Sequence, residues 1–205
     1  ISPDFNKFID KHNLIKTTVI ENWSPVVKPN TKKIQYFKKK YNPQNKFCFI
    51  YSGTLGYKHN PELLIKVAET FPEVILIIAS RGKFANELKK ISIKRLQNIK
   101  VIKWVDFKDL SSFLSISDAL IVTLESDAST FSVPSKVYNY LTIGKPILGS
   151  MPLENLGSKK IQKLKVGNIS KPDDIRDFLN YSKKIIKDKN LRLRISKNIG
   201  KYLKT

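Results

Sequence analysis

Two apolar runs limit most strongly what this chain can fold into: residues 74–79, which are continuously apolar, and residues 119–124, in which Thr123 is the one polar residue. A strand with one solvent-exposed face alternates apolar and polar residues, whereas a continuously apolar strand is covered on both faces. Strands covered in this way are typical of a parallel sheet that lies between two layers of helices. Both runs are also far shorter than the roughly 20 residues that a membrane-spanning helix needs.

Helical and strand patterns alternate along the rest of the chain. The predicted strands cover residues 47–51, 74–79, 99–104, 119–124, 146–148 and 165–169. The predicted helices cover residues 61–71, 84–96, 109–116, 134–143, 157–164, 173–187 and 190–203. Because consecutive parallel strands are joined by right-handed crossovers, this order predicts an α/β, Rossmann-like parallel sheet with helices on both faces. Ligands of such sheets bind beyond the carboxyl ends of the strands.

Residues 1–45 do not follow this alternation. They hold only a weak helical spacing and a basic, partly helical stretch. We therefore interpret residues 1–45 as a linker with peripheral elements and residues 46–205 as one domain.

The charge is the unusual feature of the composition. The chain has 38 Lys and Arg against 17 Asp and Glu, a net charge of +21. Such a field attracts nucleic acid, anionic lipid surfaces or phosphorylated small molecules. Apart from Lys38-Lys39-Lys40 the lysines are spread along the chain, so ordinary solvated faces explain them equally well.

The helix predicted after residue 133 carries the clearest signal for an anionic ligand. Ser132 can cap this helix, Pro134 suits its first turn, and Gly144 is a good left-handed terminator. Ser135 and Lys136 then stand beside unpaired N–H groups at the helix start. The N–H groups, the helix dipole and the ammonium all favour a phosphate there.

A glycine-rich turn, Gly53-Thr54-Leu55-Gly56, follows the first predicted strand. Its glycines permit positive φ and a close approach of the backbone to a pyrophosphate, and Lys58 adds charge. The turn lacks both the Gly-Lys-Ser/Thr of a P-loop and the third glycine of a dinucleotide-binding fingerprint. A tight strand-to-helix turn also favours glycine for steric reasons, so both interpretations stay open.

Residues at the ends of two further predicted strands are candidates for binding a nucleoside. Arg81-Gly82 follows one predicted strand, and Trp104-Val105 ends the next. A nucleotide base can stack on the Trp104 ring. A buried position in the hydrophobic core would explain this tryptophan equally well.

The chain shows no pattern for a metal site. One cysteine, Cys48, and two histidines, His12 and His59, lack the spacing of metal ligands. Cys48 lies in an apolar run, and we expect a buried thiol in a reducing cytosol.

Several segments occur together in a recognisable order: YSGTLGYKHNPELL, NIKVIKWV, DAL, VPSKVYNYLTIGKPIL and MPLENLGSKKI. In this order they resemble family-4 glycosyltransferases of the GT-B fold. They look most like the branch that builds bacterial surface polysaccharides and lipid-linked oligosaccharides. The resemblance covers about three quarters of the chain, residues 19–169.

The resemblance implies the C-terminal, donor-binding half of a two-domain retaining glycosyltransferase, so the N-terminal, acceptor-binding half would be missing here. The donor would be a UDP- or GDP-sugar and the acceptor a glycan or lipid-linked molecule. No metal and no cofactor are implied. The location would be cytoplasmic, at the inner face of the membrane, with no nucleic-acid partner.

The resemblance also assigns roles to particular residues, although it identifies no catalytic residue. The implied diphosphate-binding residues are Gly53, Thr54, Gly56, Lys58, Ser135, Lys136 and Val137. The implied nucleoside-binding residues are Arg81, Gly82, Trp104, Val105 and Asn139. The implied sugar-binding residues are Glu154 and Asn155.

The sequence departs from the family pattern at three positions. Many relatives carry two glutamates eight positions apart, where this chain has Phe131 and Asn139, and an arginine where it has Thr54. Neutralisation of the diphosphate would then rest on Lys58 and Lys136. Two alternatives therefore stay open: a nucleotide-sugar-binding domain without transfer activity, and a basic nucleic-acid-binding module.

Overall fold

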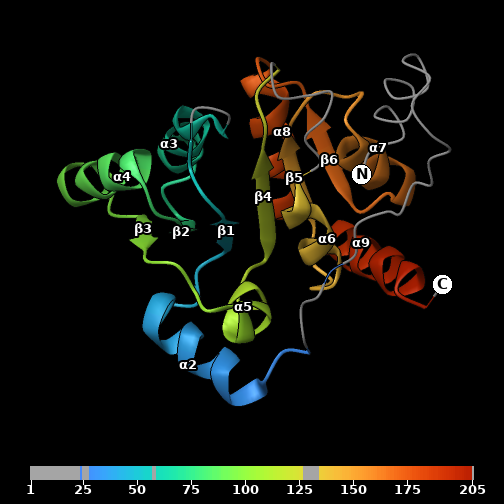
Figure 1. Ribbon diagram of the computed structural model, residues 1–205, viewed down its shortest axis with the longest axis horizontal. Helices are drawn as coiled ribbons and strands as arrows, with labels where there is room; N and C mark the ends of the chain where they lie inside the picture. The colour runs from blue at the N-terminus through green and yellow to red at the C-terminus, as the bar shows by residue number, and fades with distance from the viewer. Residues whose placement is uncertain (1–23, 25–27, 57–58, 127–133, 205) are drawn as a thin grey trace, which may run out of the picture.

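The protein, seen in a computed structural model, is built around one six-stranded parallel sheet (Figure 1). The structure describes residues 24, 28–56, 59–126 and 134–204. The strands are β1 (Cys48–Ser52), β2 (Ile75–Ala79), β3 (Ile99–Ile102), β4 (Ala119–Thr123), β5 (Ile147–Ser150) and β6 (Gly167–Ser170). Their order in the sheet is β3-β2-β1-β4-β5-β6, and every neighbouring pair is parallel. This confirms the α/β, Rossmann-like prediction.

Helices cover both faces of this sheet. They are α2 (Thr31–Tyr41), α3 (Pro61–Thr70), α4 (Lys83–Lys94), α5 (Phe107–Leu114), α6 (Ser135–Leu141), α7 (Leu156–Leu164), α8 (Ile175–Lys187) and α9 (Lys189–Tyr202). Helix α8 contacts α3, β5 and β6, so α3 and α8 share one face. Since the β1-to-β2 and β4-to-β5 crossovers run in opposite directions across the sheet, right-handedness places α6 on the other face.

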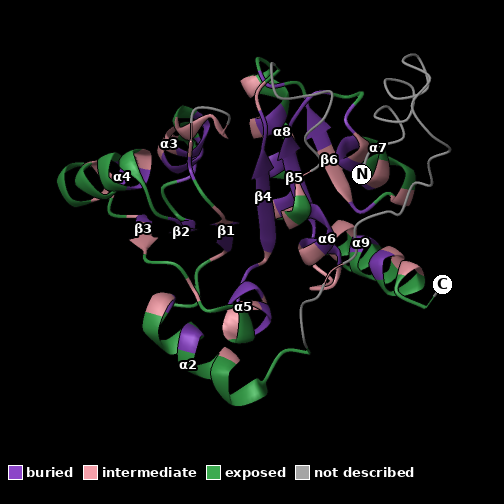
Figure 2. Cartoon of the chain, in the orientation of Figure 1, coloured by how far each residue is buried: buried purple, intermediate pink, exposed green. Residues whose placement is uncertain are grey.

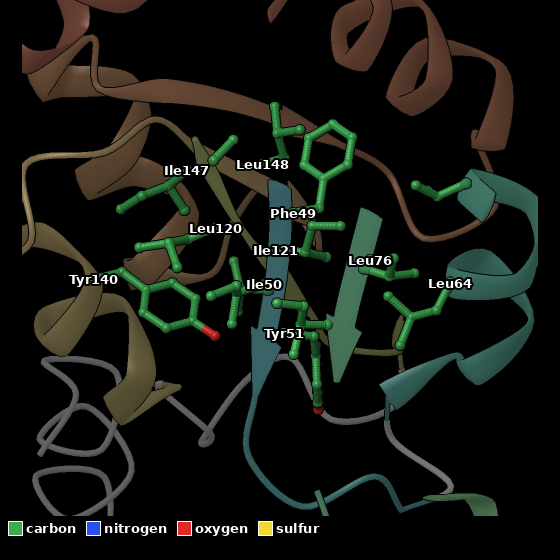
Figure 3. Packing of buried hydrophobic residues seen from close by; sticks show 14 of the residues in the cluster. Phe49, Ile50, Tyr51, Leu64, Leu76, Leu120, Ile121, Tyr140, Ile147 and Leu148 are labelled. Carbon is green, nitrogen blue, oxygen red and sulfur yellow. The ribbon is translucent and has the colours of Figure 1, made fainter. Parts of the chain in front are cut away.

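The core occupies the space between the sheet and these helices (Figure 2). Strands β2 and β4 are buried along their whole length, as their apolar runs predict. The one polar residue of β4, Thr123, donates its hydroxyl to the His59 carbonyl at 2.8 Å. Figure 3 shows how Phe49 and Ile50 of β1 pack among Leu76 and Leu120 of the neighbouring strands. The burial on both faces explains why these strands carry no alternating polar positions.

The boundaries of two helices test the capping arguments. Asn60 caps α3 as its sequence suggests, because its side chain accepts a hydrogen bond from the Leu63 N–H at 3.0 Å. The predicted helix over residues 134–143 is shorter in the structure. Pro134 is its N-cap rather than its first residue, and α6 ends at Leu141, before a turn that brings Gly144 to φ +77°. The proposed cap Ser132 lies outside the described residues.

Helix α2 is fixed against α5 rather than extending away from the sheet. Phe37 stacks on Tyr41, with ring centroids 6.1 Å apart, and meets the edge of Phe113 of α5 at 5.6 Å. The Asn30 N–H also donates to Ser112 Oγ at 2.9 Å. Within the stretch that we interpreted as a linker, residues 31–41 therefore pack on the rest of the protein.

The direction in which the chain crosses the sheet reverses between β1 and β4. From β1 the chain proceeds through β2 to β3 on one side, and from β4 it proceeds through β5 to β6 on the other. The loops that leave the carboxyl ends of β1 and β4 therefore diverge to opposite faces. Such a reversal opens a crevice between the two loops, and this is where open α/β sheets bind their ligands.

Candidate functional site

The predicted diphosphate-binding residues come together at this reversal between β1 and β4. Gly53 follows β1, and Lys136 lies in the first turn of α6, which follows β4. A Cβ added to Gly53 would lie only 2.9 Å from Lys136 Nζ. Two positions that are far apart in the sequence therefore touch at the carboxyl edge of the sheet.

Lys136 is held in place by Tyr51, the fourth residue of β1. Its Nζ donates a hydrogen bond to the Tyr51 hydroxyl at 2.9 Å. The same Nζ lies 4.1 Å from the centroid of the Tyr51 ring, which is a cation–π contact. An ammonium has three donors, and among the described residues only Tyr51 accepts a hydrogen bond from it.

The ammonium of Lys136 is buried, and burial disfavours a charged group. Burial lowers its pKa to about 7, because a partly desolvated ammonium is less stable than one in water. Among the described residues, no carboxylate lies within 4.0 Å of it. A lysine so desolvated at the functional edge of a sheet is a candidate for binding an anion, which would restore its charged form.

Tyr51 was not among the residues predicted from the sequence. Its side chain is fully buried, and burial raises its pKa, so the hydroxyl keeps its proton. That proton is donated to the Thr54 carbonyl oxygen at 3.0 Å, and a lone pair is left to accept from Lys136. A tyrosine at the end of a buried strand needs a partner for its hydroxyl, and this was the signal available in the sequence.

Most backbone N–H groups of the glycine-rich turn are hydrogen-bonded, two of them to residues at the end of β2. The Gly53 N–H donates to the Ala79 carbonyl at 3.0 Å, and the Leu55 N–H donates to Ser80 Oγ at 3.0 Å. The Gly56 N–H donates to Nδ1 of His59 at 3.2 Å. Within the described part of the turn, only the Thr54 N–H has no such partner. The turn is thus anchored by these bonds, and the Thr54 N–H is a candidate donor to a ligand.

The nucleoside candidates lie beside this turn at the ends of β2 and β3. The Arg81 guanidinium lies 4.7 Å from the centroid of the Trp104 ring, and Trp104 is 47% exposed. A Cβ on Gly82 would lie 3.8 Å from the Leu55 carbonyl oxygen, which places this turn next to the first one. Trp104 is therefore a surface ring rather than a core residue, whereas Val105 packs on the core.

The remaining residues of α6 face different surroundings. Ser135 is exposed at the start of the helix, whereas the Val137 side chain is fully buried and its N–H donates to the Pro134 carbonyl at 2.9 Å. Asn139 accepts a hydrogen bond from Ser24 Oγ at 3.0 Å. The structure therefore gives the side-chain oxygen of Asn139, a predicted nucleoside-binding residue, a partner within the protein.

The two sugar-binding candidates lie at the start of α7. Glu154 is exposed, whereas Asn155 is 3% exposed and its side-chain oxygen accepts from the Gly157 N–H at 2.9 Å. Asn155 therefore caps α7. A Cβ on Gly157 would lie 3.3 Å from Val137 Cγ2, so this cap lies against α6.

Two predictions cannot be placed in this geometry. Lys58 and Phe131 lie outside the described residues. Among the residues that are described, no group of three or more His, Cys, Asp or Glu side chains is arranged to hold a metal ion.

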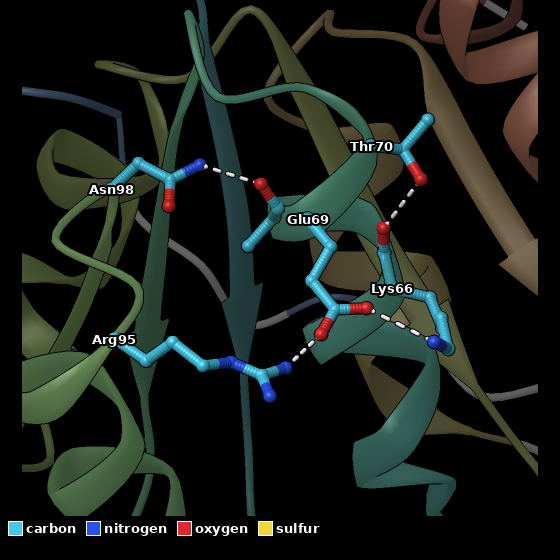
Figure 4. A network of polar contacts seen from close by, with 6 residues as sticks. Lys66, Glu69, Thr70, Arg95 and Asn98 are labelled. Carbon is cyan, nitrogen blue, oxygen red and sulfur yellow. Dashed lines mark hydrogen bonds and ion pairs between the residues drawn. The ribbon is translucent and has the colours of Figure 1, made fainter.

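A cavity of about 630 Å³ lies at the opposite edge, near the amino ends of β1, β2 and β3. Its wall includes Lys46 and Lys100, together with Arg95, which pairs with Glu69. Figure 4 shows this ion pair and the neighbouring hydrogen bond from Asn98 Nδ2 to the Ala68 carbonyl. These side chains join the ends of α3 and α4. Ligands of parallel sheets bind at the carboxyl edge, so we place the candidate site there and not in this cavity.

Comparison with known proteins identifies relatives of this chain. The family model for glycosyl transferases group 1 matches residues 32–202. WcaI of Escherichia coli (strain K12), assigned to colanic acid biosynthesis as a glycosyl transferase, is 30% identical over 105 residues, which are 50% of this chain and 26% of WcaI.

Two solved structures share the fold. HepE (Alr3699) of Anabaena in complex with UDP-glucose has a TM-score of 0.72 at 19% identity, over 89% of this chain and 51% of HepE. Sucrose-phosphate synthase of Thermosynechococcus elongatus has a TM-score of 0.79 at 13% identity, over 99% of this chain and 52% of the synthase. The chain thus spans about half of these two proteins and a quarter of WcaI.

Proposed function

The chain belongs to the glycosyl transferases group 1 family, and we propose that residues 46–205 form the donor-binding domain of a retaining glycosyltransferase. The donor is a UDP- or GDP-sugar, and the acceptor is a glycan or lipid-linked molecule in bacterial surface-polysaccharide synthesis. Relatives support this assignment: WcaI is assigned to colanic acid biosynthesis, and HepE was solved with UDP-glucose. We place the reaction in the cytoplasm.

One observation carries the proposal. The Lys136 ammonium, desolvated and without a described carboxylate nearby, touches Gly53 across the reversal of strand order. This arrangement suits a linked pair of phosphoryl groups, because the anion would supply the counter-charge that the described residues do not.

The same groups can assist the chemistry. As the bond between sugar and diphosphate breaks, the leaving diphosphate gains negative charge. A cation that is already aimed at it stabilises the transition state more than the ground state. Lys136 would provide this charge together with Lys58, and no metal ion or cofactor enters the proposal.

Calorimetric titration of the protein with UDP, GDP and a short RNA tests the proposal. We expect one of the two nucleotides to bind, because the site is built for a diphosphate, and RNA to bind weakly at moderate salt. Tight binding of RNA together with no binding of either nucleotide would instead support a nucleic-acid-binding module. A nucleotide sugar that binds but is never transferred by the complete two-domain protein would support a domain without transfer activity.

Substitution of Gly53 tests the contact at the centre of the site. Gly53 has φ +138°, which side-chain-bearing residues rarely adopt, and a Cβ there would push against Lys136 Nζ. We expect Gly53→Ala to cost about 1–3 kcal/mol of stability and to weaken UDP binding. Gly56→Ala is the matched control for stability alone, since its nearest contact, 3.8 Å from His59 Nδ1, is ordinary. Equal free energies of unfolding for the two variants would contradict the strained, crowded position of Gly53.

A further inference from the structure

The cavity of about 630 Å³ at the amino ends of β1, β2 and β3, here called the amino-edge cavity, takes no part in the donor site. Its wall contains three cations, Lys46, Arg95 and Lys100, and one carboxylate, Glu69. Small-molecule sites commonly have volumes of about 300–1,000 Å³. The amino-edge cavity is therefore large enough for a small ligand, and its wall carries a net positive charge.

The one carboxylate of this wall is already engaged. Glu69 forms ion pairs with both Lys66 and Arg95, one at each carboxylate oxygen (Figure 4). Lys46 and Lys100, in contrast, form no ion pair with any described residue. The described part of the protein therefore leaves the charge of these two lysines unbalanced.

The loop from α2 to β1 brings the two lysines to the same place. Asn42 is 3% exposed, and its side chain donates to the Lys46 carbonyl at 2.7 Å and accepts from the Lys46 N–H at 3.0 Å. Lys100 Nζ donates to the Tyr41 carbonyl at 2.9 Å, one residue before Asn42. Lys46 leads into β1 and Lys100 lies in β3, so this loop connects cations from either side of β2.

Neutral amides complete the polar part of the wall. Gln44, Gln97 and Asn98 line the same cavity. The Asn98 Nδ2 group donates to the Ala68 carbonyl at 2.9 Å and to the Phe71 carbonyl at 3.2 Å, which fixes this side chain. Its side-chain oxygen accepts no hydrogen bond from the described residues. Because amides both donate and accept hydrogen bonds, they suit the hydroxyl groups of a ligand.

The charge of the wall indicates the class of ligand. Three cations and one carboxylate give a local charge of +2, and a phosphate monoester carries about −1.5 to −2 at pH 7. An adjoining cavity of about 500 Å³ shares Asn42 and Pro43 with the first and adds Lys38 and Lys39 to the positive field that attracts anions. The wall of the amino-edge cavity holds no aromatic ring on which a nucleotide base could stack.

We propose that the amino-edge cavity binds a small hydroxylated molecule that carries a phosphate monoester. Lys46 and Lys100 bind the phosphate, and the amides of the wall bind the hydroxyl groups. This second site lies at the edge of the sheet opposite to the donor site, and the two share no residue. The inference therefore does not depend on the proposed function.

Calorimetric titration with sorbitol 6-phosphate, sorbitol and inorganic phosphate tests the second site at about pH 7.5, where the ester is a dianion. We expect sorbitol 6-phosphate to bind and sorbitol not to bind. Inorganic phosphate should bind at least about tenfold more weakly than the ester, since it cannot reach the amides as well. In the variant Lys46→Gln, Lys100→Gln the affinity for the ester should fall at least about tenfold, because two charged donors are lost.

The matched control removes two lysines elsewhere. Lys183 and Lys184 are exposed on α8 and do not line the cavity, so that Lys183→Gln, Lys184→Gln changes the net charge equally. This control should bind sorbitol 6-phosphate as the wild-type protein does. If the loss of Lys100 unfolds the protein, Lys46→Gln alone supplies the test with a severalfold loss, because the Lys46 ammonium makes no hydrogen bond with the described residues.

Three results would overturn the second site: no wild-type binding of sorbitol 6-phosphate, equal affinity for inorganic phosphate, or an equal loss in the α8 control. Binding that is lost in Lys136→Met but kept in the Lys46 and Lys100 variant would also overturn it, since the ester would then occupy the donor site. UDP affinity should be unchanged in the Lys46 and Lys100 variant. A wild-type protein that binds the ester but neither UDP nor GDP would contradict the donor site alone.

Discussion

Replacement of Lys136 by alanine is expected to weaken UDP binding by about 1–3 kcal/mol, or roughly 5- to 150-fold. The Nζ of Lys136 is the cation at the reversal of strand order, and a hydrogen bond from a charged donor to a phosphate is among the stronger polar contacts. The variant also loses the contact with Tyr51 at 2.9 Å, which aims the ammonium. Isothermal titration calorimetry with UDP at one fixed pH measures the effect.

Two further variants make this result interpretable. Lys136→Met keeps most of the side-chain volume, so it should lose as much affinity as the alanine variant if charge is the cause. Lys163→Ala removes an exposed lysine of α7 and should leave UDP affinity unchanged. Unchanged affinity in both Lys136 variants, with intact circular dichroism spectra, would remove this residue from the site.

The pH dependence of binding provides an independent check on Lys136. Its pKa in the free protein is about 7, which lies below the ordinary value of 10.5. The diphosphate binds the protonated form, so affinity should be highest below pH 7 and should fall as the pH rises above it. UDP-glucose is the suitable ligand, because its diphosphate does not titrate near neutrality. In Lys136→Met the affinity should be nearly flat over the same range.

Replacement of Gly167 by alanine is expected to cost about 3 kcal/mol or more of stability. Gly167 pairs with Ile147 in the parallel register of β5 and β6. A Cβ on Gly167 would lie 1.7 Å from the Ile147 carbonyl oxygen and 2.7 Å from its carbonyl carbon. Because these are backbone atoms of a paired strand, the clash cannot be relieved by rotation of a side chain. Chemical unfolding with urea measures the loss.

Gly200→Ala is the matched control for this prediction. Gly200 lies in α9, and a Cβ there would meet nothing within 4 Å. Alanine is the better helix former, so this variant should gain about 0.5–1 kcal/mol. Equal unfolding free energies for Gly167→Ala and the wild-type protein would show that β6 does not pair with β5 in this register.

The sequence predicts the elements of this fold better than their boundaries. Apolar runs without alternation identified β2 and β4, because strands covered on both faces lack regularly spaced polar residues. Asn60 identified the start of α3 through its capping side chain. The start of α6 was misplaced by one residue, because Pro134 serves as an N-cap that makes no side-chain hydrogen bond.

Predicting the candidate site requires the order of the strands in the sheet in addition to the sequence motifs. Gly53 and Lys136 were each predicted from a local pattern, but only the adjacency of β1 and β4 makes them touch. Tyr51 was missed because its role depends on partners on both sides of that junction.

A crystal structure of the protein with bound UDP tests the central claim most directly. We predict the diphosphate at the carboxyl ends of β1 and β4, with a phosphate oxygen about 3 Å from Lys136 Nζ. A diphosphate found instead in the cavity beside Lys46 and Lys100, at the amino ends of the strands, would contradict the account.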